Sequence, residues 1–200
     1  MGSFLISGAV YSRIESQFVN QVVIDQAWGN GCPLGKMPVL AVSFNGDFIK
    51  IKIQYDKSVM YVNDSAYRVC TVNLRVPNMS GKRLELKSFK LIGSSFINRL
   101  EAYVPELKSF YMHSQISLNF LTSADYVYHE GQLSTRSLAI EATPGIPLKQ
   151  SSNCRDSNRS ENVFARVSSR IVADKYLNQE FTEFGLNLVE LELKIASCKI

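Results

Sequence analysis

A tight hairpin centred on Asn45 and Gly46 is the feature that most restricts the folds open to this chain. Asn-Gly readily adopts positive φ at both positions, as a type I′ turn between antiparallel strands requires. The predicted arms are Pro38–Phe44 and Phe48–Tyr55, with Asp47 completing the loop. Isoleucines alternate with polar residues in the second arm, which is typical of a strand with one buried and one solvated face. The sequence therefore predicts an antiparallel sheet that contains this hairpin.

Alternation of apolar and polar residues predicts further strands along the chain. They are Phe4–Tyr11, Val59–Val62, Tyr67–Val76, Phe110–Thr122 and Leu186–Ile195. The composition of Pro77–Gly81 predicts a turn. After it, Leu84 and Leu86 share one face while Phe89 and Leu91 are out of phase with them. We therefore expect a β-bulge near Lys87 and Ser88.

Three segments carry apolar residues at helical spacing, and we expect helices there. They are Ile14–Trp28, with Gly29 at its end, Ser94–Val104, which Pro105 would end, and Val163–Leu177. Residues 130–162 are rich in polar and turn-forming residues, and their composition predicts a long mobile loop.

The order of these elements predicts an α+β fold in a single domain over residues 1–200. Two or three helices would pack against a mainly antiparallel sheet, since helix and strand do not alternate as in a doubly wound parallel sheet. A length of 200 residues suits one domain with a substantial core.

The four cysteines indicate neither a zinc site nor a disulfide framework. Cys32, Cys70, Cys154 and Cys198 are scattered, with no C-x-x-C pair and no histidine at ligand spacing. We expect reduced thiols in a cytosolic compartment. The N-terminus shows no signal-peptide pattern, and no apolar run approaches the ~18 residues of a membrane span.

Modification motifs are weak. Three N-x-S/T sequons, at Asn63, Asn78 and Asn158, are attributed to chance without a secretory signal. Gly2 lacks the Ser or Thr at position 6 that myristoylation favours, so lipidation is not expected.

Motifs of known catalytic sites are absent from the sequence. It contains no G-x-S-x-G, no H-E-x-x-H and no phosphate loop. The glycine-rich stretch 29–35 follows a predicted helix, whereas a nucleotide loop follows a strand, so an ordinary connection is expected. We therefore predict a protein that is not an enzyme and has no catalytic residue, cofactor or metal site.

Individual residues with catalytic potential have simpler interpretations. His113 and His129 are assigned structural or solvent-facing roles. Glu190 and Glu192 share a strand face with Lys194, which indicates a solvated sheet surface and not an acid–base pair.

Basic residues form the most suggestive groups in the sequence. The candidate contacts to an anionic lipid or nucleocapsid surface are Lys82, Arg83, Lys87 and Lys90, followed by Lys50 and Lys52. A third group is Arg155, Arg159, Arg166 and Arg170. A net charge of +4 permits such contact without requiring it. Base-specific RNA reading is not expected, since no aromatic-interleaved RNA motif is present.

Two short motifs, in order, resemble the matrix proteins of rhabdoviruses. Gly35-Lys36-Met37-Pro38 is similar to the family's G-K-x-P step into a strand, and Val104-Pro105-Glu106 is similar to its V-P-E step. The segment Phe181–Leu191 resembles the closing hydrophobic segment of that family. The lysine-rich tail and P-P-x-Y motif common in the family are missing, so recruitment of host sorting machinery is not implied.

The resemblance implies a viral structural protein that self-associates and condenses the nucleocapsid at a membrane. Its implied partners are further copies of the chain, the viral nucleoprotein–RNA complex and anionic lipid of an inner membrane surface. The implied location is the virion and the host cytoplasm, peripheral to the membrane. An RNA-binding accessory protein (a movement protein or silencing suppressor) and a small cytosolic enzyme using Cys32 or Cys70 are the alternatives.

Overall fold

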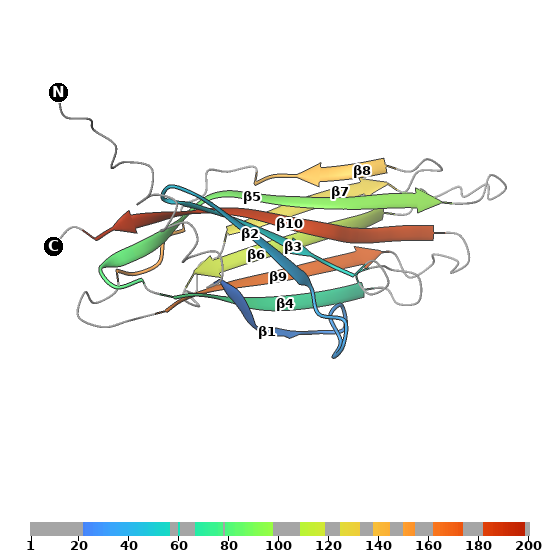
Figure 1. The fold of residues 1–200 in the computed structure, drawn as a ribbon. Helices are drawn as coiled ribbons and strands as arrows, with labels where there is room; N and C mark the ends of the chain where they lie inside the picture. Colours follow the sequence, from blue (N-terminus) through green and yellow to red (C-terminus); the bar gives the residue numbers. More distant parts are fainter. Residues whose placement is uncertain are drawn as a thin grey trace, which may run out of the picture.

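In the computed structural model of the protein, the described part consists of strands and their connections (Figure 1). The structure describes residues 22–56, 60, 67–77, 79–97, 109–118, 125–132, 138–144, 150–154, 162–173 and 182–198. Ten strands form two five-stranded antiparallel sheets, and no helix occurs within these ranges. The α+β prediction is therefore wrong.

Sheet A has the strand order β1-β4-β9-β6-β7. Its strands are β1 (Val23–Trp28), β4 (Tyr67–Val76), β6 (Ser109–Leu118), β7 (Asp125–Gln132) and β9 (Val163–Ala173). Apart from β6 and β7, neighbours in the sheet are not consecutive in sequence, and β9 is inserted between β4 and β6.

Sheet B has the order β2-β3-β10-β5-β8. Its strands are β2 (Val39–Asn45), β3 (Phe48–Gln54), β5 (Lys82–Ile97), β8 (Leu138–Ala142) and β10 (Thr182–Ser197). The two longest strands, β5 and β10, pair along almost their whole lengths at the centre of the sheet.

The core lies between the two sheets, which form a sandwich. Alternate residues of each strand point inward, as the period of two requires. Sheet B contributes Ile49, Ile51 and Ile53 from one strand, and sheet A contributes Val72 and Leu74 from another, all fully buried. One continuous apolar cluster results, and it leaves the outer face of each sheet to solvent.

Several strand predictions are confirmed. The Asn45-Gly46 hairpin joins β2 to β3, with Gly46 at φ 58°. The strand Tyr67–Val76 matches β4, and the other two predicted strands that are described correspond to β6 and β10. The expected bulge lies at Lys87, since Leu86 pairs with Leu193 and Ser88 with Glu192, which leaves no partner for the residue between them.

The predicted helix Val163–Leu177 is wrong because residues 163–173 form β9. Phe164, Val167 and Ile171 suggested helical spacing, but the buried positions alternate strictly through Ala165 and Ser169. Ser169 is polar and still lies inward, because its Oγ is 2.8 Å from the Tyr55 hydroxyl and accepts a hydrogen bond from Ser114 Oγ at 2.6 Å. Because Ser169 is a polar residue at an inward position, the alternation of buried and outward residues was not apparent in the sequence.

The other two helix predictions fail over their described parts. Residues 23–28 of the first form β1, paired with β4. Ser94–Ile97 of the second continue β5 and pair with β10, and Ser94 and Ser95 pair also with β8. The β5 strand passes β10 closely at Gly93, where an added Cβ would lie 2.7 Å from the Gly185 carbonyl oxygen.

The range 130–162 is not one long loop. It contains the end of β7, all of β8 and the segment Gln150–Cys154. That segment lies along β5, where Leu86 N–H donates to Gln150 O at 2.9 Å and Ser152 N–H donates to Leu84 O at 2.8 Å. Backbone hydrogen bonds to β5 hold these polar residues in place, although their sequence has no apolar pattern.

The prediction of reduced thiols is wrong. Cys32 is bonded to Cys70 and Cys154 to Cys198, across separations of 38 and 44 residues. Neither cysteine of the proposed enzyme alternative has a free thiol to act as nucleophile. The first bridge ties the β1–β2 connection to β4, and the second ties the segment beside β5 to the end of β10.

Some predictions fall outside the described residues. They include the strand Phe4–Tyr11, residues 14–21, most of Val59–Val62 and the motif Val104-Pro105-Glu106. The sequons at Asn63, Asn78 and Asn158 also lie there, as do Arg155 and Arg159.

Candidate functional site

The predicted basic contacts gather on the outer face of sheet B, where carboxylates balance them. Lys52 Nζ lies 2.7 Å from Glu190 and Lys90 Nζ lies 2.7 Å from Glu141. Lys50 pairs with Glu192 at 3.5 Å. The pairs span β3, β10, β5 and β8, so positive and negative charges alternate across the sheet. This confirms Glu190 and Glu192 as part of a solvated sheet surface.

The remaining members of the group surround one carboxylate. Arg83 and Lys87 contact the two oxygens of Glu85 at 2.8 and 2.7 Å. Hydrogen bonds from Lys87 and Arg83 lower the pKa of Glu85 below its ordinary value. Lys82 lies at the start of the same strand. Because the cations are matched by carboxylates on their own face, the surface offers less net positive charge than the sequence indicated.

The outer face of sheet A has a different composition, which the sequence did not single out. Outward side chains form cross-strand rows, because directly paired residues share a face. One row is Trp28, Thr71, Ser168 and Gln115, from β1, β4, β9 and β6. A second row is Gln26, Asn73, Arg166 and Ser117. Amide, hydroxyl and guanidinium groups thus cover this face.

Two aromatic–guanidinium pairs lie on this face. The Arg166 guanidinium lies over the Trp28 ring at 5.6 Å from its centroid, and that of Arg170 lies over the Tyr67 ring at 5.3 Å. Trp28 remains 43% exposed and Tyr67 46%. The two arginines are four residues apart on one strand, so the pairs are separated by roughly 13 Å along the sheet. The hydroxyl row of Thr71 and Ser168 lies between them.

Hydrogen bonds fix the polar side chains between the aromatic rings. Arg166 Nε donates to Asn73 Oδ1 at 3.2 Å, and the hydroxyls of Thr71 and Ser168 are 3.0 Å apart. His113 lies opposite Arg170 on the neighbouring strand. Burial, and then the positive charge of Arg170, lower the pKa of His113, so its imidazole is neutral near pH 7. The face is therefore largely preorganised.

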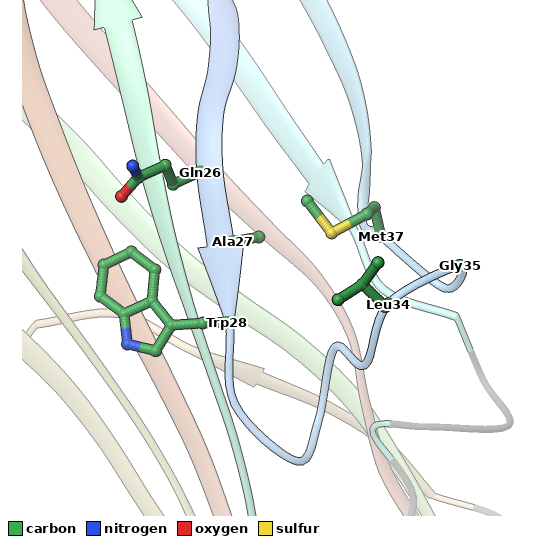
Figure 2. A pocket seen from close by; sticks show the side chains of 6 residues that line it. All are labelled: Gln26, Ala27, Trp28, Leu34, Gly35 and Met37. Carbon is green, nitrogen blue, oxygen red and sulfur yellow. The ribbon is translucent and has the colours of Figure 1, made fainter.

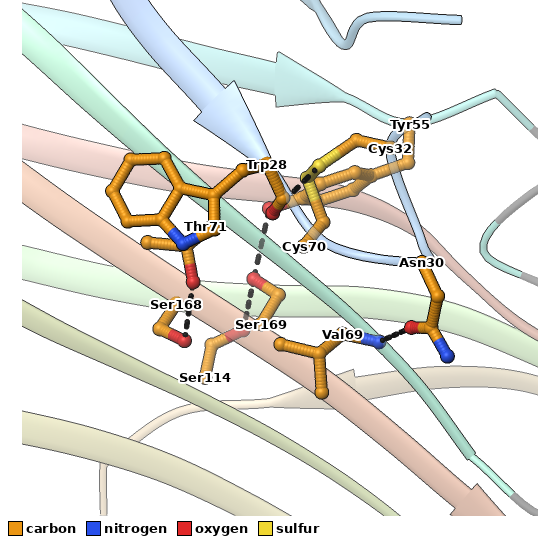
Figure 3. The surroundings of a disulfide bond; sticks show 10 residues. All are labelled: Trp28, Asn30, Cys32, Tyr55, Val69, Cys70, Thr71, Ser114, Ser168 and Ser169. Carbon is orange, nitrogen blue, oxygen red and sulfur yellow. Dashed lines mark hydrogen bonds between the residues drawn. A yellow bond between two sulfur atoms is a disulfide. The ribbon is translucent and has the colours of Figure 1, made fainter. Parts of the chain in front are cut away.

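The connection that carries Trp28 is clamped to β4 (Figure 3). Val69 N–H donates to Asn30 Oδ1 at 2.7 Å, and Gly31 N–H donates to Val69 O at 2.8 Å. Cys32 is bonded to Cys70 in the same strand, and its sulfur, which carries no proton, contacts the Trp28 carbonyl oxygen at 3.2 Å. The indole is thereby held at a fixed position beside β4.

The glycine-rich stretch 29–35 forms part of this clamp. It leaves a strand, β1, and enters β2 in the other sheet without opening a helix. Gly29 has φ 121°, and a Cβ there would lie 2.2 Å from the Val69 carbonyl oxygen. The preceding helix, on which the interpretation of this stretch as an ordinary connection was based, is therefore wrong.

An open apolar hollow lies on the other side of β1 (Figure 2). Its volume is about 540 Å³, and it is lined by Ala27, Leu34, Gly35 and Met37 together with Gln26 and Trp28. Figure 2 shows the side chains of Gln26 and Trp28 directed away from Ala27, toward the outer face of sheet A. The hollow therefore shares Gln26 and Trp28 with the ends of the polar rows, while Ala27 lies on the opposite side of β1 from those two side chains.

Clusters suited to a metal ion do not occur within the described ranges. No group of three or more His, Cys, Asp or Glu side chains is placed there to hold one. None of the described segments is a helix long and apolar enough to cross a membrane. His129, the second histidine of the sequence, lies in β7.

Sequence reasoning missed Trp28, Tyr67, Asn73 and Gln115. The alternation of β4 placed Thr71 and Asn73 on one face, opposite Val72 and Leu74, but Trp28 was assigned to a helix end. Arg166 and Arg170 were noted as basic residues near a loop. Polar residues alternate along segment 164–170. They would have indicated this face if the segment had been interpreted as a strand.

Comparison with known proteins assigns no family. No protein-family profile and no curated protein sequence matches the chain. Among solved structures, the chain resembles the carbohydrate-binding module TmCBM61 in complex with beta-1,4-galactotriose, with a TM-score of 0.23, 8% identity, and coverage of 91% of this chain and 92% of that one. A family 29 carbohydrate-binding module has a TM-score of 0.27, 11% identity, and coverage of 83% and 90%. The family 11 module of a Clostridium thermocellum cellulase has a TM-score of 0.23, 9% identity, and coverage of 92% and 94%. These scores are too low to assign a family or a ligand.

Proposed function

We propose that the protein is a carbohydrate-binding module and that the outer face of sheet A is its binding surface. The observation that carries the proposal is the pair of exposed rings, Trp28 and Tyr67, flanking rows of planar polar side chains. Sugars present apolar C–H faces and a rim of hydroxyl groups. A surface that combines flat rings with paired donors and acceptors complements both features.

The rings supply the apolar half of this recognition. An aromatic face carries partial negative charge and attracts the weakly positive C–H groups of a sugar ring. Trp28 and Tyr67 lie on adjacent strands, β1 and β4, and Trp28 pairs with Thr71, four positions along β4 from Tyr67. The extended spacing suits a chain of sugars and not a single one.

The planar side chains supply the polar half. Gln26 and Gln115 offer exposed amide donors and acceptors, one from each row, while the largely buried Asn73 orients Arg166. Because Asn73 is already held by Arg166 and Thr71 by Ser168, little side-chain entropy is lost when a ligand binds. This preorganisation favours affinity on an open surface.

The disulfides support the same function. They form and persist in oxidising compartments, including the extracellular space, where glycans are abundant. On the outer face of sheet B, in contrast, Lys50, Lys52 and Lys90 are paired with carboxylates, and the ring of Phe48 is less exposed than those of Trp28 and Tyr67.

Binding can be followed through Trp28, which is the single tryptophan of the chain. Titration with soluble oligosaccharides and polysaccharides (β-glucan, galactan, mannan and xylan) is expected to change its emission with at least one ligand. Trp28→Ala and Tyr67→Ala should each weaken that binding by about tenfold or more, measured by calorimetry, because a central aromatic contact contributes on the order of 2 kcal/mol.

The matched control is Phe48→Ala. Phe48 forms a similar ring–cation pair with Lys194, 5.9 Å from the ring centroid, on the opposite sheet. This variant should bind as the parent does. A protein that binds none of the four polysaccharides, or one whose affinity is unaffected by loss of Trp28 and Tyr67, would contradict the proposal.

Matrix-type assembly stays a prediction from sequence resemblance. The balanced charges on sheet B reduce the attraction that its lysines could offer to anionic lipid. Polymerisation of the purified protein as ionic strength falls would favour assembly over glycan binding as the main function.

A further inference from the structure

Charge is distributed differently over the two outer faces of the sandwich. On sheet B, Lys50, Lys52 and Lys90 each lie within 3.5 Å of a carboxylate oxygen. On sheet A, Arg170 is exposed, and none of the ion pairs among the described residues includes it. Its guanidinium contacts the uncharged ring of Tyr67. The positive charge of Arg170 therefore remains available at the surface.

Resting on the proposed function, we infer that the bound glycan is acidic and that a carboxylate or sulfate on one of its sugars contacts the guanidinium of Arg170. A guanidinium presents parallel N–H donors that match two oxygens of such a group. Tyr67, beneath that guanidinium, would contact the same sugar or its neighbour.

The surroundings of Arg170 suit an anion. The outward residue opposite it on β6 is His113, and the one opposite it on β4 is Val69. Neither carries negative charge. Burial, and then the charge of Arg170, lower the pKa of His113, in line with the position of the two residues opposite each other. Arg166, four residues along β9, adds a second guanidinium on the same face.

The neutral groups around these arginines distinguish a glycan from a nucleic acid. Hydroxyl and amide side chains fill the rows between the two ring–guanidinium pairs, and Arg75 is partly matched by Asp25 at 3.9 Å. A nucleic-acid groove follows a continuous phosphate backbone and needs more cations. Sparse charge among many neutral polar groups fits a polysaccharide with occasional acidic substituents.

Matched ligand pairs test the inference and identify the acidic group. Polygalacturonate is compared with its methyl-esterified form for carboxylate, and dextran sulfate with dextran for sulfate. We expect at least one acidic member to bind about tenfold more tightly than its neutral partner at low salt, since a charge-assisted hydrogen bond contributes that much. The preference should diminish as salt rises.

Variants connect the preference to Arg170. Arg170→Gln should remove most of the preference for the acidic ligand, measured as the ratio of the affinities for the acidic and neutral members, and Arg170→Lys should retain part of it. Lys52→Gln, which removes the same charge from sheet B, should bind as the parent does. Circular dichroism confirms that each variant is folded.

The possible outcomes separate this inference from the function on which it rests. Equal binding of acidic and neutral members overturns the acidic specificity and leaves glycan binding intact. Absence of binding to every polysaccharide, including the neutral panel, overturns both. Tighter binding of single-stranded RNA than of any glycan would replace the acidic glycan with a nucleic acid.

Discussion

Replacing Cys32 and Cys70 together with alanine is expected to lower the free energy of unfolding by about 4 kcal/mol. The bridge joins residues separated by 38 positions, and the entropy model for a loop of this size gives that value. Glycan affinity should fall as well, because the bridge holds the connection that positions Trp28 against β4. Urea denaturation followed by circular dichroism measures the first effect and calorimetry the second.

The second disulfide provides the control for this experiment. Cys154 and Cys198 are separated by 44 residues, so their double alanine variant should lose a similar amount of stability. That bridge lies at the end of β10 in sheet B, and binding should be unchanged under conditions where the variant stays folded. Equal loss of affinity in both variants would show that stability alone, and not the position of Trp28, accounts for the effect.

Gly29→Ala is expected to lower the free energy of unfolding by roughly 3 kcal/mol, through backbone strain and a steric clash together. Gly29 has φ 121°, a conformation that side chains rarely adopt, and its Cβ would lie 2.2 Å from the Val69 carbonyl oxygen. Relief of that clash requires the turn to move away from β4. Trp28 precedes this residue, so the variant should also bind glycan more weakly.

Gly35→Ala separates the two causes. Gly35 also has positive φ, at 88°, but no atom lies within 4 Å of the position its Cβ would occupy. Only backbone strain of about 1–2 kcal/mol is then expected, with binding unchanged. If Gly29→Ala were no more destabilising than Gly35→Ala in urea denaturation, the close packing of the turn on β4 would not contribute to the free energy of unfolding.

Local patterns predicted those strands whose inward residues are mainly apolar. The isoleucines of β3 alternate without exception, the inward Cys70, Val72, Leu74 and Val76 of β4 follow the same period, and turn chemistry fixed the Asn45-Gly46 connection. The bulge at Lys87 was predictable from the same alternation, because an extra residue in one strand moves every later side chain to the opposite face.

Prediction failed where long-range contacts determine the structure. Ser169 is acceptable in the core only because Tyr55 and Ser114, both distant in sequence, bond to it. Burial raises the pKa of Tyr55 well above its usual value, so the phenol stays protonated there. Without knowledge of these partners, the segment that contains Ser169 has the spacing of a helix.

The candidate site could not be assembled from the sequence for the same reason. Trp28, Thr71, Ser168 and Gln115 come from four strands that are dispersed along the chain. Their common face depends on strand order, which local periodicity does not encode. The lysines of sheet B were found, but most of the carboxylates that balance them lie on other strands.

The sequence by itself determined the turn at Asn45-Gly46, the alternation of β3, β4 and β10, and the bulge in β5, because each depends on the geometry of neighbouring residues. Tertiary structure alone decided the pairing of the cysteines, the strand identity of residues 163–173 and the ring–guanidinium face of sheet A. These depend on contacts between residues 38 to 138 positions apart, whose free energy is gained only when the sheets pack.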